Sequence, residues 1–247
     1  MLNTQMAKTA LITGAAKRVG KAISLHLAGL GWNVAIHYNS SETEALLLQD
    51  ELRSFFPNQR FEIFRANLDH TNETENLIPQ VLQAMEKIDL LINNASVFDR
   101  GSFTNTDTSF LDRQMNVNFR APFILTRDFA RLIPEGLIIN FTDTRIVNNQ
   151  SNYAAYSLSK KALWEMTKMA ALELGPKIRI NAIAPGLMLA PEGKKDDYLW
   201  KLADRIAMKR PGGLNPVLTS LDYILSNDYL TGQLLFCDGG ENLGVTT

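Results

Sequence analysis

Residues 8–38 read KTALITGAAKRVGKAISLHLAGLGWNVAIHY, and this stretch decides the fold. Thr9–Thr13 is a short apolar run typical of a buried parallel strand, and a second such run begins at Val34. The apolar residues between the two runs recur at helical spacing: Val19, Ile23, Leu27 and Leu30. A turn bracketed by Gly14 and Gly20 precedes this helix, so the stretch predicts a strand–helix–strand unit.

The turn of this unit has the character of a phosphate-binding site. Backbone amides at a helix N-terminus attract the pyrophosphate of a dinucleotide, and glycines let it approach the backbone closely. The strict pattern G-x-G-x-x-G does not fit residues 14–20, and any tight turn between a strand and a helix can use a glycine structurally. Both interpretations stay open on this motif alone.

The rest of the chain continues to alternate short apolar runs with helical segments. Further strands are expected at 61–65, 88–93, 136–141, 178–183 and 233–237, and long helices near 108–132 and 153–174. This alternation predicts an α/β fold, with a parallel sheet covered by helices on both faces. A length of 247 residues with 45% hydrophobic content suits one domain spanning residues 1–247.

Composition excludes several classes of function. The net charge is −1 and no basic block occurs, so a nucleic-acid partner is not expected. Cys237 is the only cysteine, which forbids an internal disulfide and suits the cytosol. Residues 1–7 lack a signal pattern and no apolar run approaches a membrane span, so we expect a cytoplasmic protein without a membrane partner. No Cys/His cluster suggests a metal site.

Tyr156 and Lys160 form a Tyr-x-x-x-Lys pair within the helix expected at 153–174, where residues four apart share a face. A phenol titrates near ~10, and a neighbouring ammonium lowers that value, so the pair suits a proton donor. Asp143 lies thirteen positions before the tyrosine. Its carboxylate can assist the proton transfer, cap a turn or pair with Arg145.

Six motifs occur in the order typical of short-chain dehydrogenases/reductases: TGAAKRVG at 13–20, NNAS at 93–96, NVNFRAP at 116–122, Tyr156 with Lys160, NAIAPG at 181–186 and DGG at 238–240. The chain resembles that family from about Lys8 to Gly240. The resemblance implies a single-domain Rossmann fold with a doubly wound, seven-stranded parallel sheet. It also implies a catalytic tetrad, of which Asn118, Tyr156 and Lys160 match three members. Asp143 occupies the position of the fourth member, a serine.

Two departures make the chain resemble the pteridine reductases and the dihydromonapterin reductases, which are also called alternative dihydrofolate reductases. Arg18 replaces the middle glycine of the usual turn, and Asp143 replaces the serine. This resemblance implies NADPH-dependent reduction of a dihydropterin (dihydrobiopterin, dihydromonapterin or dihydrofolate) to the tetrahydro form. A carboxylate can accept hydrogen bonds from pterin donors, an arginine can bind phosphate or the pterin carbonyl, and Phe98 offers a flat face to the ring.

The expected site residues follow from these motifs and this resemblance. The catalytic residues are Asp143, Tyr156, Lys160 and Asn118. Those expected to bind the cofactor are Gly14, Lys17, Arg18, Val19, Gly20, His37, Tyr38, Asn39, Ser40, Ser41, Asn67, Leu68, Asn94, Ala95, Ser96, Tyr156, Lys160, Pro185 and Gly186. Those expected to bind substrate are Arg18, Ser96, Phe98, Asp143, Tyr156, Leu187 and Met188. Residues 187–213 are expected to form a substrate lid.

The segment after the second strand favours NADPH over NADH. Enzymes that use NAD commonly place an acid there to bind the ribose 2′-hydroxyl. Here the segment reads His37-Tyr-Asn-Ser-Ser41, and Glu42 comes late. Residues 39–41 can hydrogen-bond a 2′-phosphate, and Lys17 can attract it.

Two other functions stay open. One is reduction of a ketone such as a 3-oxoacyl thioester or a sugar, and the other is a cofactor-binding regulator without turnover. The intact Asn118, Tyr156 and Lys160 argue against the regulator, while Asp143 and Arg18 argue against the ketone reductase. Relatives often pair the helices near 108–132 and 153–174, so a homo-oligomer, dimer or tetramer, is expected.

Overall fold

The computed structural model describes residues 7–149, 151–191, 193 and 197–244. Within these residues seven parallel strands form one sheet in the order β3-β2-β1-β4-β5-β6-β7. The strands are β1 (Thr9–Ile12), β2 (Asn33–Tyr38), β3 (Phe61–Arg65), β4 (Leu90–Asn93), β5 (Gly136–Phe141), β6 (Ile178–Pro185) and β7 (Leu234–Cys237). The expected fold, a doubly wound seven-stranded Rossmann sheet, is confirmed.

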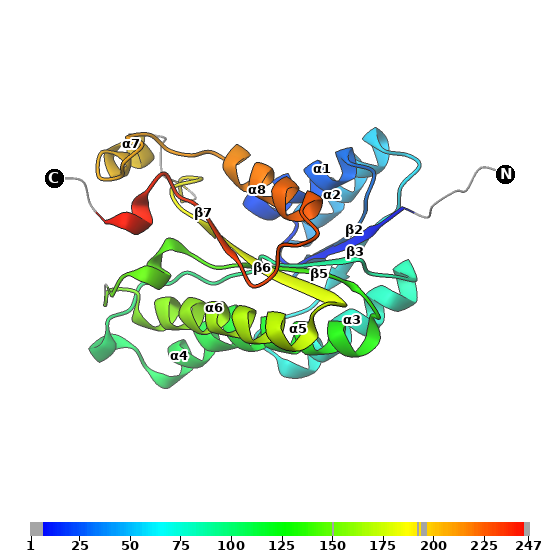
Figure 1. Ribbon diagram of the computed structural model, residues 1–247, viewed down its shortest axis with the longest axis horizontal. Coiled ribbons are helices and arrows are strands. Elements are labelled where there is room, and N and C mark those ends of the chain that lie inside the picture. Colours follow the sequence, from blue (N-terminus) through cyan, green and yellow to red (C-terminus); the bar gives the residue numbers. More distant parts are fainter. Residues whose placement is uncertain (1–6, 150, 192, 194–196, 245–247) are drawn as a thin grey trace.

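Helices cover both faces of the sheet (Figure 1). One face carries α1 (Arg18–Gly29), α2 (Glu42–Phe55) and α8 (Asn215–Ser226). The other carries α3 (Thr71–Met85), α4 (Thr108–Met115), α5 (Ala121–Leu132) and α6 (Ala154–Leu174). Helix α7 (Asp197–Ala203) lies apart from both layers, near the C-terminus. Among the helices of the described ranges, none combines the length and the apolar character that crossing a membrane requires.

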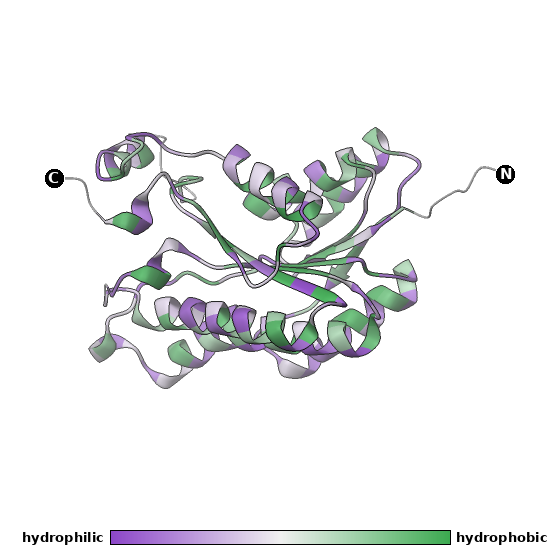
Figure 2. Cartoon of the chain, in the orientation of Figure 1, coloured by the Kyte–Doolittle hydropathy of each residue, from purple (hydrophilic) through white to green (hydrophobic). Residues whose placement is uncertain are grey.

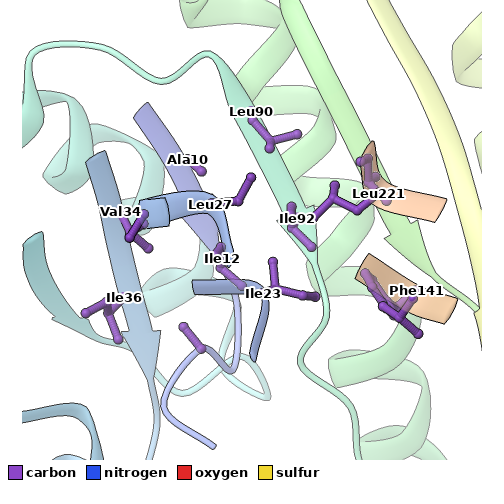
Figure 3. Packing of buried hydrophobic residues seen from close by; sticks show 14 of the residues in the cluster. Ala10, Ile12, Ile23, Leu27, Val34, Ile36, Leu90, Ile92, Phe141 and Leu221 are labelled. Carbon is purple, nitrogen blue, oxygen red and sulfur yellow. The ribbon is translucent and has the colours of Figure 1, made fainter. Parts of the chain in front are cut away.

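The strands are apolar along most of their length because helices exclude water from both of their faces. Figure 3 shows one of the two cores, where Ile12 of β1 and Ile92 of β4 lie beside Ile23 of α1. All three side chains are fully buried, and each such burial contributes roughly 1.5–3 kcal/mol. Figure 2 shows the hydrophobic residues concentrated along the sheet and on the inner helix faces.

Five strand boundaries differ from the expected ones. Strand β1 ends one residue early, β2 begins one residue early, β4 begins at Leu90 rather than at residue 88, and β7 begins at Leu234 rather than at residue 233. Strand β6 continues to Pro185, which pairs with Cys237 of β7. The helical segment expected at 108–132 is interrupted by a π-helical turn, η2 (Asn116–Arg120). This turn contains Asn118, whose buried side chain binds the loop after β4. That loop is distant in sequence, which is why local periodicity gave no sign of the π-helical turn.

The turn between β1 and α1 depends on its two glycines. Gly14 has φ +62°, a conformation that other residues adopt only at a cost. A Cβ atom at Gly20 would lie 2.1 Å from the Gly14 carbonyl oxygen and 2.9 Å from Ala15 Cα. Both neighbours are backbone atoms, so no rotation of a side chain can make room. The close approach of helix and strand therefore requires glycine at position 20.

We predict that Gly20→Ala lowers the free energy of unfolding by about 1–3 kcal/mol, the usual cost of forcing an extra methyl into a packed site. Gly29→Ala is the matched control in the same helix, because a Cβ there meets nothing within 4 Å. That variant should be more stable than the unaltered chain by roughly 0.5–1 kcal/mol, since alanine orders at a lower entropic cost than glycine. Urea denaturation measures both, and equal stability of the two variants contradicts the packing argument.

Candidate active site

The residues expected to form the site follow the carboxyl ends of the strands, where open α/β sheets bind their ligands. They line two neighbouring cavities, of about 600 Å³ and about 410 Å³. Four residues line both: Arg18, Val19, Asn94 and Ser96. The two cavities therefore meet beside the N-terminus of α1, at the point where the strand order reverses between β1 and β4.

The larger cavity brings together the residues expected to bind the phosphates and the adenosine. Of the predicted cofactor residues it is lined by Gly14, Lys17, Arg18, Val19, Gly20, His37, Tyr38, Asn39, Ser40, Ser41, Asn67, Leu68, Asn94, Ala95 and Ser96. Asp69 and Arg113 also line it and were not predicted, because neither belongs to a recognisable motif. No side chain caps the N-terminus of α1, so its first amides are available to an anion.

His37 supports the turn between β1 and α1. Its Nδ1 accepts a hydrogen bond from the Gly14 amide at 3.0 Å, and its Nε2 lies 3.0 Å from the Ala66 carbonyl oxygen, to which it donates. Burial lowers the pKa of His37 to about 4, so the ring is neutral and both nitrogens are occupied. His37 therefore lines the cavity but offers it no free polar atom.

Polar residues surround the end of the cavity beyond β2. Asn39 donates to the Asn67 side chain at 3.4 Å, and Ser40 and Ser41 line the same wall. Lys17 forms an ion pair with Glu44 at 3.2 Å, with both side chains partly exposed. A phosphate at this end of the cavity would find a lysine and several hydroxyl and amide donors, although Lys17 would divide its charge between Glu44 and the phosphate.

The smaller cavity brings together the residues expected to act on the substrate. Of these it is lined by Arg18, Ser96, Phe98, Asp143, Tyr156, Lys160, Leu187 and Met188, and also by Pro185 and Gly186. Residues Tyr198, Leu199 and Leu202 of the expected lid close one side. The part of that lid at 192 and 194–196 lies outside the described residues.

Tyr156 donates a hydrogen bond from its hydroxyl to Asp143 Oδ2 at 2.7 Å. Asp143 also accepts from the Arg145 amide at 2.8 Å, which fixes the carboxylate at the start of η3 (Thr144–Val147). Lys160 lies one helical turn after the tyrosine, and its ammonium is 5.8 Å from the centre of the Tyr156 ring. The ammonium donates to the Phe141 carbonyl oxygen at 2.8 Å. Strand β5, η3 and α6 thus converge on one phenol.

The expected lowering of the pKa of Tyr156 is wrong. Burial raises the pKa of Tyr156 well above its ordinary value, and the charge of Asp143 and the hydrogen bond to it raise it further. Burial also lowers the pKa of Lys160 to about 8, although Asp143 opposes this shift. The local expectation counted only the lysine four residues away and omitted both the desolvation and the nearby carboxylate. Tyr156 is therefore a protonated hydrogen-bond donor at neutral pH.

Asn118 lies outside both cavity walls and is fully buried. Its Oδ1 accepts from the Ser96 hydroxyl and the Val97 amide at 2.9 Å each. Its Nδ2 donates to the Val97 carbonyl at 2.9 Å and to Gln114 at 3.2 Å. Asn118, which is expected to be catalytic, thus fixes the loop that carries Ser96 and Phe98.

Arg18 connects the turn between β1 and α1 to the expected lid. Its φ is +52°, a left-handed conformation that costs a non-glycine residue roughly 1–2 kcal/mol. The guanidinium donates to the carbonyl oxygens of Ala190 at 3.0 Å and Leu189 at 3.4 Å. Arg18 therefore lies where the two cavities meet and binds the first part of the lid.

Phe98 belongs to an aromatic cluster that the sequence did not reveal. Its ring stacks on Tyr153 with centroids 4.5 Å apart and an angle of 2° between the planes. It also meets the Tyr156 ring edge-on at 4.7 Å. The Arg145 guanidinium lies over the Tyr153 ring at 4.5 Å. Tyr153 lies one helical turn before Tyr156, and this spacing is the one signal that could have identified it.

Chemically, the arrangement can hold a dinucleotide and protonate a ligand in the neighbouring cavity. The Gly14 turn, the free amides of α1 and the polar wall after β2 fit a phosphate-bearing cofactor. The cavity around Tyr156 offers a neutral acid, a carboxylate and an aromatic surface. Across the described residues, no group of three or more His, Cys, Asp or Glu side chains is arranged to hold a metal ion.

Comparison with known proteins agrees with this architecture. Residues 8–197 match the family model of the short chain dehydrogenases. The crystal structure of FolM alternative dihydrofolate reductase 1 from Brucella suis in complex with NADP is similar, with a TM-score of 0.91 and 32% identity over 97% of each chain. The 3-oxoacyl-(acyl-carrier-protein) reductase FabG of Staphylococcus epidermidis is 28% identical over 95% of this chain and 99% of that protein. Dihydromonapterin reductase of Escherichia coli is 26% identical over 94% of this chain and 96% of that protein.

We predict that Asp143→Asn lowers the pKa of Tyr156, because it removes the negative charge that disfavours the phenolate. The phenolate absorbance followed during an alkaline titration measures this pKa. Subtracting the same titration of a Tyr156→Phe variant isolates the one phenol. Asp69→Asn is the control, since it removes a carboxylate from the other cavity. An unchanged or higher pKa of Tyr156 in Asp143→Asn contradicts the assigned pairing.

Proposed function

Because this chain belongs to the short-chain dehydrogenase family, we propose that its NADPH-dependent reduction is directed to the C=N bond of a dihydropterin. The chain is an NADP-dependent oxidoreductase. The observation that carries the pterin proposal is the hydrogen bond of Tyr156 to Asp143. Asp143 occupies the position at which the family resemblance implies a serine. A carboxylate accepts hydrogen bonds from the N–H groups of a pterin, whereas it repels a ketone oxygen.

The larger cavity would hold the cofactor through this chain's own backbone and polar side chains. The amides at the N-terminus of α1 would bind the pyrophosphate, and Lys17 with Ser40 would bind the 2′-phosphate. Asn94 and Ser96 lie where the cavities meet and would line the path of the nicotinamide toward Tyr156. When bound, NADPH supplies the hydride that reduces the carbon of the C=N bond.

Tyr156 would donate the proton that the neighbouring ring nitrogen takes up. Its raised pKa keeps the proton in place until a nitrogen of rising basicity is available. Lys160 would stabilise the phenolate that remains, since its ammonium is 5.8 Å from the ring centre. Asp143 would orient the phenol and accept from a pterin N–H group with its other oxygen. Each residue thus holds or moves a proton at a defined atom.

The aromatic cluster supports a flat, fused-ring substrate. Phe98 is about half exposed and has Tyr153 stacked on one face, so its edge and remaining surface border the cavity. Aromatic stacking of this kind is worth about 0.5–1.5 kcal/mol beyond area burial. The likeness to FolM alternative dihydrofolate reductase 1 and to dihydromonapterin reductase supports the same substrate class.

A second candidate is reduction of a 3-oxoacyl thioester, which is supported by the similarity to FabG. That reaction requires a donor to the carbonyl oxygen beside Tyr156. The position that would supply it holds Asp143, whose Oδ1 and Oδ2 both act as hydrogen-bond acceptors. The pterin proposal is therefore preferred.

We also propose that the chain forms a homo-oligomer through α5 and α6. Both helices expose large apolar side chains: Phe123 and Leu132 on α5, and Leu158, Met169 and Leu172 on α6. Leu172 is 88% exposed and Met169 is 70% exposed, which is unfavourable in water unless another surface covers them.

We predict that Asp143→Ser lowers kcat/KM for dihydrobiopterin on the order of 10²-fold or more, the range of general acid–base contributions. The measurement is the initial rate of NADPH oxidation with dihydrobiopterin, dihydromonapterin, dihydrofolate and an acetoacetyl thioester in parallel. The thioester rate should not fall in this variant, because serine restores a hydroxyl donor. Tyr156→Phe is the control that should lose every activity. Full pterin turnover by Asp143→Ser contradicts the role given to the carboxylate.

We predict that Ser40→Asp raises KM for NADPH far more than KM for NADH, because it opposes the 2′-phosphate with a negative charge in the wall of the larger cavity. Ser40→Asn is the neutral control and should leave the ratio of the two KM values nearly unchanged. Steady-state kinetics with each cofactor measures both. Equal effects of Ser40→Asp on the two cofactors would mean that the 2′-phosphate lies elsewhere.

A further inference from the structure

The turn after β7 brings a second carboxylate to the smaller cavity. Gly239 and Gly240 have φ +65° and +88°, and the chain then enters η4 (Glu241–Leu243). Asp238 fixes this turn, because its carboxylate accepts from the Gly240 amide at 2.9 Å and the Asn242 amide at 2.7 Å. Glu241 lies between these two amides in the chain, and it lines the same cavity as Tyr156.

The Glu241 side chain reaches a buried position without finding a partner there. Its Oε2 is shielded from solvent and has no hydrogen bond to any described residue. A buried carboxyl oxygen without a donor is costly, so such an atom needs an explanation. Since Glu241 belongs to the cavity wall, a donor carried by a ligand can satisfy it.

Charged groups from several elements face Glu241. Burial, together with the charges of Asp143 and Asp238 and against the opposing charge of Arg145, raises the pKa of Glu241 to about 7. The turn η3, which follows Asp143 and contains Arg145, packs against η4. This part of the cavity therefore disfavours an additional negative charge, even with the arginine present.

The other charged and titratable groups of the cavity wall do not donate a hydrogen bond to Glu241 Oε2. Arg18 donates to lid carbonyls, and Lys160 donates to the Phe141 carbonyl. Tyr156 donates to Asp143, and Tyr198 belongs to α7. None of these hydrogen bonds satisfies Glu241 Oε2.

We propose that Glu241 determines specificity in this site, by accepting a hydrogen bond from a hydroxyl on the substrate's side chain and by repelling substrates that carry a carboxylate. This inference rests on the proposed pterin function. It selects dihydropterins with a short hydroxylated side chain, such as dihydrobiopterin and dihydromonapterin, over dihydrofolate, whose glutamyl tail is anionic.

The test compares Glu241→Gln with the unaltered chain on three substrates: dihydrobiopterin, dihydrofolate and the dimethyl ester of dihydrofolate. The variant keeps the size of the side chain and loses its charge. We expect kcat/KM for dihydrofolate to rise about tenfold relative to that for dihydrobiopterin, the factor that one partly screened charge pair supplies. The uncharged ester should show no such gain. Glu135→Gln is the matched control, because it removes the same charge from an exposed site before β5, at the opposite edge of the sheet.

The pH dependence supplies a second readout. Glu241 gains its charge as the pH rises through about 7, so discrimination against dihydrofolate should increase across that range in the unaltered chain. It should stay flat in Glu241→Gln. An unchanged substrate ratio in the variant, or an equal change with all three substrates, overturns the inference and leaves the pterin function standing. Absence of turnover of every pterin by the unaltered chain overturns the proposed function itself, and the inference with it.

Discussion

The site depends on the hydrogen bonds that join the turn after β1 to the turn after β4. The Thr13 hydroxyl accepts from the amides of Asn94 and Ala95 at 3.0 Å each. The Asn94 side chain donates back to the carbonyls of Thr13 at 2.9 Å and Gly14 at 3.1 Å. These turns flank the reversal of strand order, so the four hydrogen bonds hold them together at the point where the two cavities meet. Any substitution that separates the turns would displace the cofactor wall and the substrate wall together.

A second constraint acts on the chemistry, and it is electrostatic. Tyr156 is buried and its hydroxyl donates a hydrogen bond to the Asp143 carboxylate, so the phenol keeps its proton at neutral pH. Burial lowers the pKa of Lys160 to about 8. The pair therefore differs from a tyrosine activated by a lysine alone. Burial and Asp143 together raise the pKa of the phenol and keep it protonated, which suits delivery of a proton to a ring nitrogen.

The sequence predicted the fold and the order of the site residues, because both depend on local patterns. Apolar runs predicted the parallel strands, and five strands deviate by only one or two residues at an end. The spacing of Tyr156 and Lys160 predicted that both lie on one face of α6, and they do. Since every strand of a parallel sheet ends at the same edge, motifs that follow strands had to meet there.

The sequence by itself determined which residues reach the carboxyl edge, whereas only the tertiary structure decided what they do to one another. The pKa of Tyr156 depends on burial and on Asp143, the partners of Arg18 lie in the lid, and Glu241 reaches the cavity from the last turn of the chain. Local periodicity carries no information on these contacts, because each joins elements that are far apart in sequence. The pKa of a group depends on its desolvation and on the charges around it. The residues that cause both come together only once the sheet has assembled.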